Sequence, residues 1–144
     1  LENRKEKGIK DPQGEQATQL PSDINLEEKG NAVRNQLAGV DLTNNQAAWA
    51  QLVPVVDDYL KSHLFGAIFA RDVLTYKQRE LATIGALAAM DGTQSQLSSH
   101  YGMSMNAGVT KKELLDFVTL ISSSLGEAKG ESAKTLLNKV LEGK

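Results

Sequence analysis

Two side chains near the middle of the chain are suited to transferring protons. Glu80 shares a predicted helical face with Ile84 and Leu87, so its carboxylate is expected among apolar side chains, where it needs a partner. His100 follows on the next predicted helix, and histidine is the side chain best suited to donate and accept protons near neutral pH. Glu80 and His100 are therefore the candidate catalytic residues.

Each of these residues also has an ordinary structural explanation, and the sequence leaves both interpretations open. An acidic side chain is favoured near a helix N-terminus or beside an arginine. His100 belongs to a polar helical face, which either lines a pocket or faces solvent; the other members of this face are Thr93, Gln96 and Ser104. His63 stands near the end of a predicted helix, where a histidine commonly interacts with the helix dipole, and it is assigned a structural role.

Two arginines and two polar side chains are the candidate substrate-binding residues. Arg71 and Arg79 flank the start of the central helix, and a guanidinium can bind a carboxylate through two parallel hydrogen bonds. Surface ion pairs explain both arginines equally well. Thr93 and Gln96 are expected to line the same pocket as His100.

The helices that carry Glu80 and His100 have clear boundaries in the sequence. Thr75 and Gln78 have the spacing of a capping box, which predicts a helix beginning at Tyr76. Small residues in 81–90 predict that this helix is buried and closely packed. The Asp91-Gly92 pair breaks it, and an antiparallel return of the next helix would place Glu80 opposite His100.

Helical periodicity continues through most of the chain, without a β-branched run bounded by turns. The sequence therefore predicts an all-α domain of six helices. Two predicted helices precede the central one, from about Leu26 to Ala38 and from Gln46 to Leu64. The helix that carries His100 ends near Asn106. Two more follow, from the Thr110–Glu113 capping box to Leu125 and from about Glu131 to Leu141. Pro54 fits only the first turn of a helix, so the second of the six is expected to bend or to begin later.

Composition excludes several classes of function. The chain has 144 residues, which predicts one domain that buries about 68–70% of its surface. It has no cysteine, which excludes disulfides and thiolate nucleophiles, and only two histidines, so no metal site is expected. A net charge of -2 argues against nucleic acid as a partner, and no apolar run reaches the roughly 20 residues that span a membrane.

The sequence divides into a polar N-terminal arm and a folded domain. Residues 1–22 are polar and contain two glycines and two prolines, which predicts a flexible arm. The folded domain is expected at 23–144. The expected location is the cytoplasm, with an exported form whose signal peptide has been removed as the open alternative.

The order of four sequence segments is more specific than any single residue. They are Glu28-Lys-Gly30 with Val33-Arg34 and Leu37-Ala-Gly39, then Leu64-Phe-Gly66 through Arg71 and Leu74, then residues 79–90, and then residues 106–113. This series resembles the carboxymuconolactone decarboxylase family and its relatives, the alkylhydroperoxidase D-like proteins, over roughly residues 27–137. The resemblance implies the alkylhydroperoxidase D-like fold, assembled as a homotrimer or homohexamer.

Residues 91–100 separate the chain from the thiol peroxidases of that superfamily. Their Asn-Gly-Cys-x-x-Cys-x-x-x-His pattern has Thr93 and Gln96 at the cysteine positions here, while His100 is retained. A dithiol peroxidase cycle is therefore excluded, which favours the decarboxylase-like branch. The decarboxylases' later His-x-x-x-Tyr-Ala-Gly-x-Pro segment corresponds to residues 120–128, which lack its histidine, tyrosine and proline, and the acidic residue after Gly66 is replaced by Ala67.

The resemblance implies a cofactor-independent lyase that acts on a small cyclic carboxylate or lactone. In this hypothesis His100 donates the proton, Glu80 orients the His100 imidazole, and Arg71 or Arg79 holds the substrate carboxylate. The alternative is a non-catalytic binding or assembly protein that kept the fold while its site decayed, which the altered 120–128 segment favours.

Overall fold

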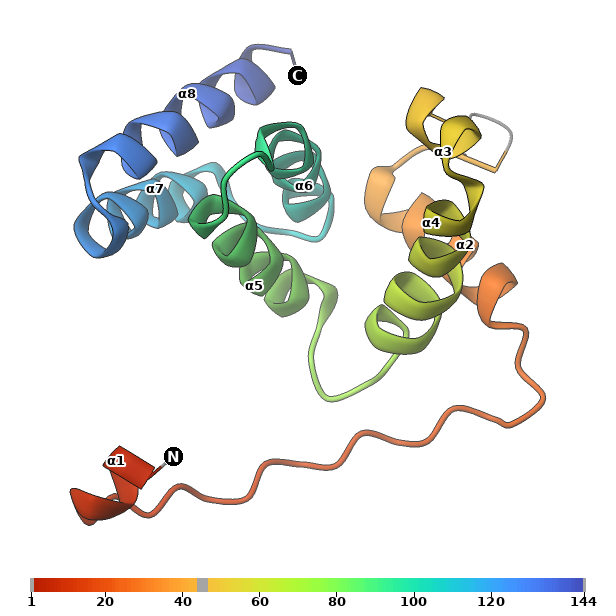
Figure 1. Cartoon of the computed structure of the whole chain (residues 1–144), viewed down its shortest axis with the longest axis horizontal. Helices are drawn as coiled ribbons and strands as arrows, with labels where there is room; N and C mark the ends of the chain where they lie inside the picture. The colour runs from red at the N-terminus through yellow and green to blue at the C-terminus, as the bar shows by residue number, and fades with distance from the viewer. Residues whose placement is uncertain (1, 44–46, 144) are drawn as a thin grey trace.

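The protein is built from helices, most of them connected by short loops, and a long extended segment separates the first helix from the others (Figure 1). The computed structural model describes residues 2–43 and 47–143, and over these residues it contains no strand, so the predicted all-α class is confirmed. In chain order the helices are α1 (Glu2–Glu6), α2 (Leu26–Ala38), α3 (Ala48–Leu52), α4 (Pro54–Tyr59), the π-helix η1 (Leu60–Phe69), α5 (Tyr76–Ala89), α6 (Gln94–Asn106), α7 (Lys111–Leu125) and α8 (Glu127–Glu142). None of the helices in this described part of the chain is both long and apolar enough to cross a membrane.

The helices form two groups, each with its own apolar core (Figure 1). Helices α5 to α8 bury one cluster, which includes Ile84, Tyr101, Leu114 and Leu137. Helices α2 and η1 pack along each other and bury the second; its buried residues are Val33, Leu37, Phe65 and Phe69. Any site between the groups must therefore be made from side chains of both.

Helix α6 contributes to both groups and so joins them. Its Leu97 and Tyr101 lie in the larger core, while Met103 packs against the α2–η1 cluster. At its C-terminal end, the side-chain amide of Asn106 donates a hydrogen bond of 2.8 Å to the carbonyl oxygen of Leu37. The position of α6 therefore determines how the two cores face each other.

The predicted helix ends are confirmed where local chemistry defines them. Thr75 accepts a hydrogen bond from the Gln78 backbone N–H, and Thr110 accepts one from that of Glu113, so both capping boxes are present. Gly39 ends α2 in the left-handed conformation, with φ of 71°. These caps fix the first residues of α5 and α7.

The predicted helix from Gln46 to Leu64 is wrong as a single unit. Its expected start at Gln46 lies outside the described residues. Pro54 takes the first position of α4, so the chain breaks at Val53, and α3 and α4 are separate short helices. The helix then continues past Leu64 to Phe69 as η1, a π-helix of ten residues, a form that is rare in proteins and usually limited to a single turn.

Two other boundaries differ from the sequence prediction. Helix α8 begins at Glu127 rather than near Glu131, because Gly126 has φ of 96° and turns the chain within one residue. The arm contains the short helix α1, which was not predicted, and residues 9–21 have no regular secondary structure. The backbone N–H of Thr18 donates a hydrogen bond to Asp72, which holds this part of the arm near the start of α5.

Glycines permit the close approach of α2 and η1. A Cβ atom on Gly30 would collide with the carbonyl group of Lys61 and would lie 2.9 Å from the backbone nitrogen of Gly66. A Cβ atom on Gly66 would in turn collide with the carbonyl oxygen of Leu26. Because these obstacles are backbone atoms, neither helix can carry a larger residue there without moving away.

Replacing Gly30 by alanine should therefore destabilise the protein. Forced separation of two packed helices costs roughly 1–3 kcal/mol or more, which urea unfolding followed by circular dichroism would measure. Gly102→Ala is the matched control, because a Cβ atom at that helical position meets nothing within 4 Å. It should be neutral or stabilising by about 0.5–1 kcal/mol, and equal effects of the two substitutions would contradict the close-packing explanation.

Candidate active site

Glu80 and His100 are in direct contact, as predicted from the antiparallel course of α5 and α6. The Nδ1 atom of His100 lies 2.8 Å from the Oε2 atom of Glu80. The Glu80 side chain has 0% exposure to solvent, while that of His100 keeps 14%. A buried acid thus supports a histidine at the edge of the core.

This contact assigns different tasks to the two imidazole nitrogens. When Nδ1 donates to the Glu80 carboxylate, Nε2 is the nitrogen left for chemistry, and the carboxylate fixes both tautomer and ring orientation. Two further oxygens near this pair, the Glu80 Oε1 and the Ser104 Oγ one turn after His100, are buried and have no hydrogen-bond partner within the described chain. Buried polar atoms of this kind normally bind water or a ligand.

His100 lines a cavity of about 510 Å³ between the two groups of helices. Volumes of this size accommodate small organic ligands. The apolar part of its wall comes mainly from α3, α4 and η1; it includes Trp49, Val56, Leu60, Leu64, Phe65 and, from α6, Met103. The polar part comprises Arg34, Asp57, Ser95, Gln96, Ser99 and His100.

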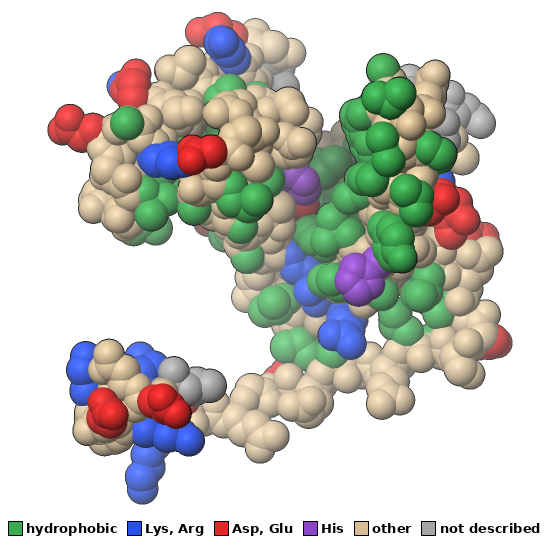
Figure 2. Space-filling view, viewed as in Figure 1, with side chains coloured by type: hydrophobic (Ala, Val, Ile, Leu, Met, Phe, Trp, Pro, Cys, Tyr) green, Lys and Arg blue, Asp and Glu red, His purple; other side chains and the backbone are tan. Residues whose placement is uncertain are grey.

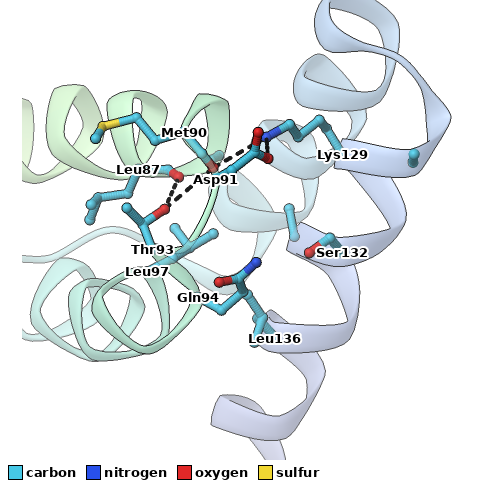
Figure 3. Close-up of a pocket in the computed structure, with 12 residues that line it drawn as sticks. Leu87, Met90, Asp91, Thr93, Gln94, Leu97, Lys129, Ser132 and Leu136 are labelled. Carbon is cyan, nitrogen blue, oxygen red and sulfur yellow. Dashed lines mark hydrogen bonds and ion pairs between the residues drawn. The ribbon is translucent and has the colours of Figure 1, made fainter.

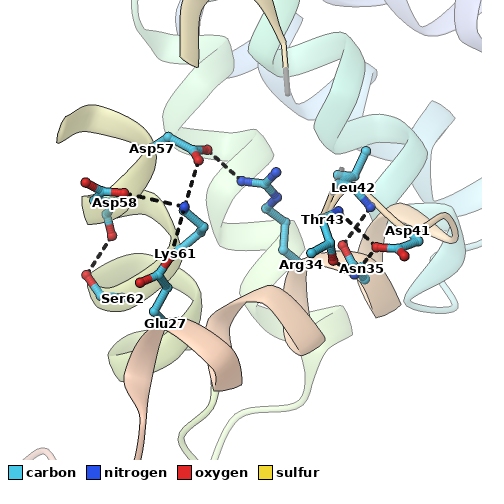
Figure 4. Close-up of polar contacts among 10 residues, drawn as sticks. All are labelled: Glu27, Arg34, Asn35, Asp41, Leu42, Thr43, Asp57, Asp58, Lys61 and Ser62. Atoms are coloured by element: carbon cyan, nitrogen blue, oxygen red, sulfur yellow. Dashed lines mark hydrogen bonds and ion pairs between the residues drawn. The ribbon is translucent and has the colours of Figure 1, made fainter. Parts of the chain in front are cut away.

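A second buried carboxylate organises the wall that α2 and α4 form. Asp57 accepts a hydrogen bond of 2.8 Å from the Nη1 atom of Arg34, and its other oxygen lies 3.0 Å from the Nζ atom of Lys61 (Figure 4). Lys61 also pairs with Glu27 at 3.0 Å, and that pair links η1 to the first turn of α2. The network ties α2, α4 and η1 together at the cavity.

The surroundings of Asp57 keep it ionised. Burial by itself would raise the pKa of this carboxyl, but the hydrogen bonds from Arg34 and Lys61 outweigh that effect and hold the pKa below its ordinary value. The same contacts raise the pKa of Lys61 well above its usual range, mainly through the hydrogen bond to Asp57 and then that to Glu27. Both groups are therefore charged across the neutral range.

The structure separates the two polar residues that were expected beside His100. Gln96 lines the cavity, one turn before His100 on α6. Thr93 does not: its hydroxyl donates a hydrogen bond of 2.7 Å to the carbonyl oxygen of Leu87, at the end of α5. It lines a different cavity, of about 240 Å³, where Lys129 bridges Asp91 and backbone oxygens of α5 (Figure 3).

The two arginines expected to bind a substrate carboxylate also lie away from the His100 cavity. Arg71 is exposed in the loop before α5. Arg79 donates hydrogen bonds from Nη2 to the carbonyl oxygens of Arg71 and Asp72, so its guanidinium holds that loop. The cavity instead has Arg34, a residue of the predicted opening helix for which the sequence predicted no role.

A signal for this second network was present in the sequence. Asp57 and Lys61 are four residues apart, the spacing of an ion pair on one helical face. Their contact with Arg34, however, joins residues that are distant in sequence, and no local pattern predicts it. Across the residues that the structure describes, no group of three or more histidine, cysteine or acidic side chains is arranged to hold a metal ion.

The protein is an all-α domain with a buried Glu–His pair at a cavity between two groups of helices. The model of the carboxymuconolactone decarboxylase family matches residues 54–138, more than half of the chain, and the chain belongs to that family. The helical architecture agrees with the alkylhydroperoxidase D-like fold of the superfamily. Comparison with curated proteins gave no match.

Replacing Asp57 by asparagine should destabilise the protein and change how its stability depends on pH. Near neutral pH, the loss of a buried charge shared by Arg34 and Lys61 should cost about 3 kcal/mol. Because folding lowers the pKa of Asp57, its stabilising effect is present above the ordinary value of 3.8 and is lost as the pH falls below it. Urea unfolding from pH 7 to pH 3 should therefore show the two proteins converging at acid pH.

The control for this experiment is Asp116→Asn. Asp116 pairs with Lys112 on the exposed surface of α7, where screening by solvent leaves little net stabilisation. Its substitution should leave the stability nearly unchanged at every pH. A constant gap between wild type and Asp57→Asn down to pH 3 would show that Asp57 does not act through its charge.

Proposed function

We propose that the protein is a cofactor-independent lyase that removes CO2 from a small cyclic carboxylate or lactone. The observation that supports this proposal most directly is the contact between buried Glu80 and His100 at the wall of the cavity. Membership of the carboxymuconolactone decarboxylase family agrees with it. The proton donor is His100, and Glu80 is a positioning residue that acts through it.

The proposed reaction needs only one proton donor from the protein. The bond between the substrate carbon and its carboxylate breaks, CO2 leaves, and the electron pair moves into a conjugated carbonyl group of the ring to form an enolate. The protonated imidazole of His100 then delivers its Nε2 proton to carbon and regains a proton from water. Glu80 stabilises the positive charge of the imidazolium before the transfer.

The protein is also proposed to act as a homotrimer or homohexamer. Large apolar side chains gather over α3 and α4 (Figure 2). Leu52 is 83% exposed and Tyr59 is 67% exposed, and Trp49, Val53, Val55 and Val56 are each exposed by more than 40%. A contiguous apolar surface of this kind commonly marks a protein interface, and it adjoins the cavity through Trp49 and Val56.

Substituting His100 by glutamine should reduce turnover by about 10²-fold or more, because glutamine keeps some hydrogen bonding but supplies no proton. The assay would follow CO2 release from carboxymuconolactone and from simpler lactone carboxylates. His63→Gln is the matched control, since His63 is exposed on η1 and does not line the cavity. Turnover that survives in His100→Gln would refute the proposed proton donor.

The oligomeric state can be tested without a substrate. Multi-angle light scattering at micromolar concentration should give a mass of three or six times the 15.6 kDa chain. Leu52→Glu should shift the population toward smaller species, because it places a charge on the apolar surface over α3 and α4. A wild-type monomer under these conditions would contradict the proposed assembly.

A further inference from the structure

We infer that Arg34 is the residue that binds a carboxylate of the ligand in the His100 cavity, and that the ligand places one carboxylate at this end of the cavity and an apolar body beyond it. This inference rests on the proposed function for the identity of the site, but it concerns equilibrium binding rather than turnover. It replaces Arg71 and Arg79, which lie elsewhere, by a residue on the cavity wall.

The guanidinium of Arg34 is held in place, but only one of its N–H donors has a partner within the described chain. Its single hydrogen bond within the described chain runs from Nη1 to Asp57, and its buried Nε has no partner there. An arginine side chain has five N–H donors, so most of them remain for another acceptor. The side chain is 12% exposed and lines the cavity, so a ligand reaches a guanidinium that has already lost most of its hydration.

Asp57 cannot satisfy Arg34 fully, because it is shared. Its Oδ1 atom accepts the hydrogen bond from Arg34 and its Oδ2 atom pairs with Lys61. The carboxylate therefore does not form the two parallel hydrogen bonds that a guanidinium favours. Lys61 has further anionic partners in Glu27 and Asp58, whereas Arg34 has none within the described chain besides Asp57. The position opposite Asp57 on the guanidinium is thus suited to a second, external carboxylate.

The remainder of the wall limits what this anion can be. Arg34 is the only lysine or arginine that lines the cavity among the described residues, and the negative Asp57 lies beside it, so a second carboxylate at this end of the cavity would be unpaired. The side chains of Leu60, Leu64, Phe65 and Met103 offer contact to an apolar body. A flat or cyclic monocarboxylate satisfies both conditions.

Benzoate and benzamide provide a matched pair of probes, since they share size and shape and differ in charge. Trp49 is the only tryptophan of the chain and lines the cavity, so its fluorescence reports binding. We expect wild type to bind benzoate more tightly than benzamide by about tenfold or more, the value typical of a hydrogen-bonded charge pair. Arg34→Gln should abolish this preference, and Arg34→Lys should retain part of it.

Three further measurements make the outcome decisive. Arg71→Gln should keep the preference for benzoate, and its loss there would overturn the inference in favour of the loop arginine. His100→Gln should also keep it, because this substitution removes only the proposed proton donor. A wild-type protein that shows no turnover but binds benzoate through Arg34 would refute the lyase and support the anion site. If Arg34→Gln does not fold, nitrogen NMR of wild type decides: benzoate but not benzamide should shift the Arg34 Nε–H signal, and an unmoved signal would overturn the inference.

Discussion

The burial of two carboxylates, Asp57 and Glu80, is the constraint on which the arrangement of the cavity depends. An ionised acid inside an apolar core is costly unless a basic side chain is held against it. Asp57 therefore holds Arg34 and Lys61, and Glu80 holds His100, with distances between 2.8 and 3.0 Å. Glu80 lies behind the wall and Asp57 is part of it, while Arg34 and His100 both reach the cavity. The chain thus obtains two positioned nitrogen groups, one from each group of helices, without placing either on a mobile loop.

The sequence predicted those elements whose boundaries follow from local chemistry. Capping boxes at Thr75 and Thr110 and the glycine at position 39 marked helix ends correctly, because a side chain or a positive φ satisfies the terminal backbone groups there. The segment from residue 48 to residue 69 was harder. Its periodicity fits one long helix. Pro54 breaks that helix at Val53, as its position in the sequence suggested, whereas the π-helical hydrogen bonding of η1 occurs where η1 packs against α2 and where Gly30 and Gly66 bring the two backbones together. Tertiary contact of this kind leaves no periodic pattern.

In the site, too, the parts that local sequence determines could be predicted, and the parts that tertiary packing determines could not. Glu80 and His100 lie on consecutive antiparallel helices, so the turn at Asp91-Gly92 nearly determines their contact. Thr93 had the right position in the pattern, yet its hydroxyl is used to close the end of α5, and a pattern of residue types cannot reveal that use. Arg34 could not be predicted, because its partner is twenty-three residues away on an element whose packing angle the sequence does not define.

The cavity lies at the seam between two apolar cores, and this position explains both its size and its vulnerability. Side chains fill each core closely, as in other proteins, so space for a ligand remains where the cores meet. Two of the contacts that cross the seam in the described part of the chain come from α6: Met103 packs on the α2–η1 cluster, and the side-chain amide of Asn106 donates a hydrogen bond to the carbonyl oxygen of Leu37. His100 stands on the same helix as both of these residues, while Arg34 stands on the helix they contact. A change in these contacts would therefore alter the separation of His100 and Arg34, so the geometry of the site depends on the seam as well as on the two cores.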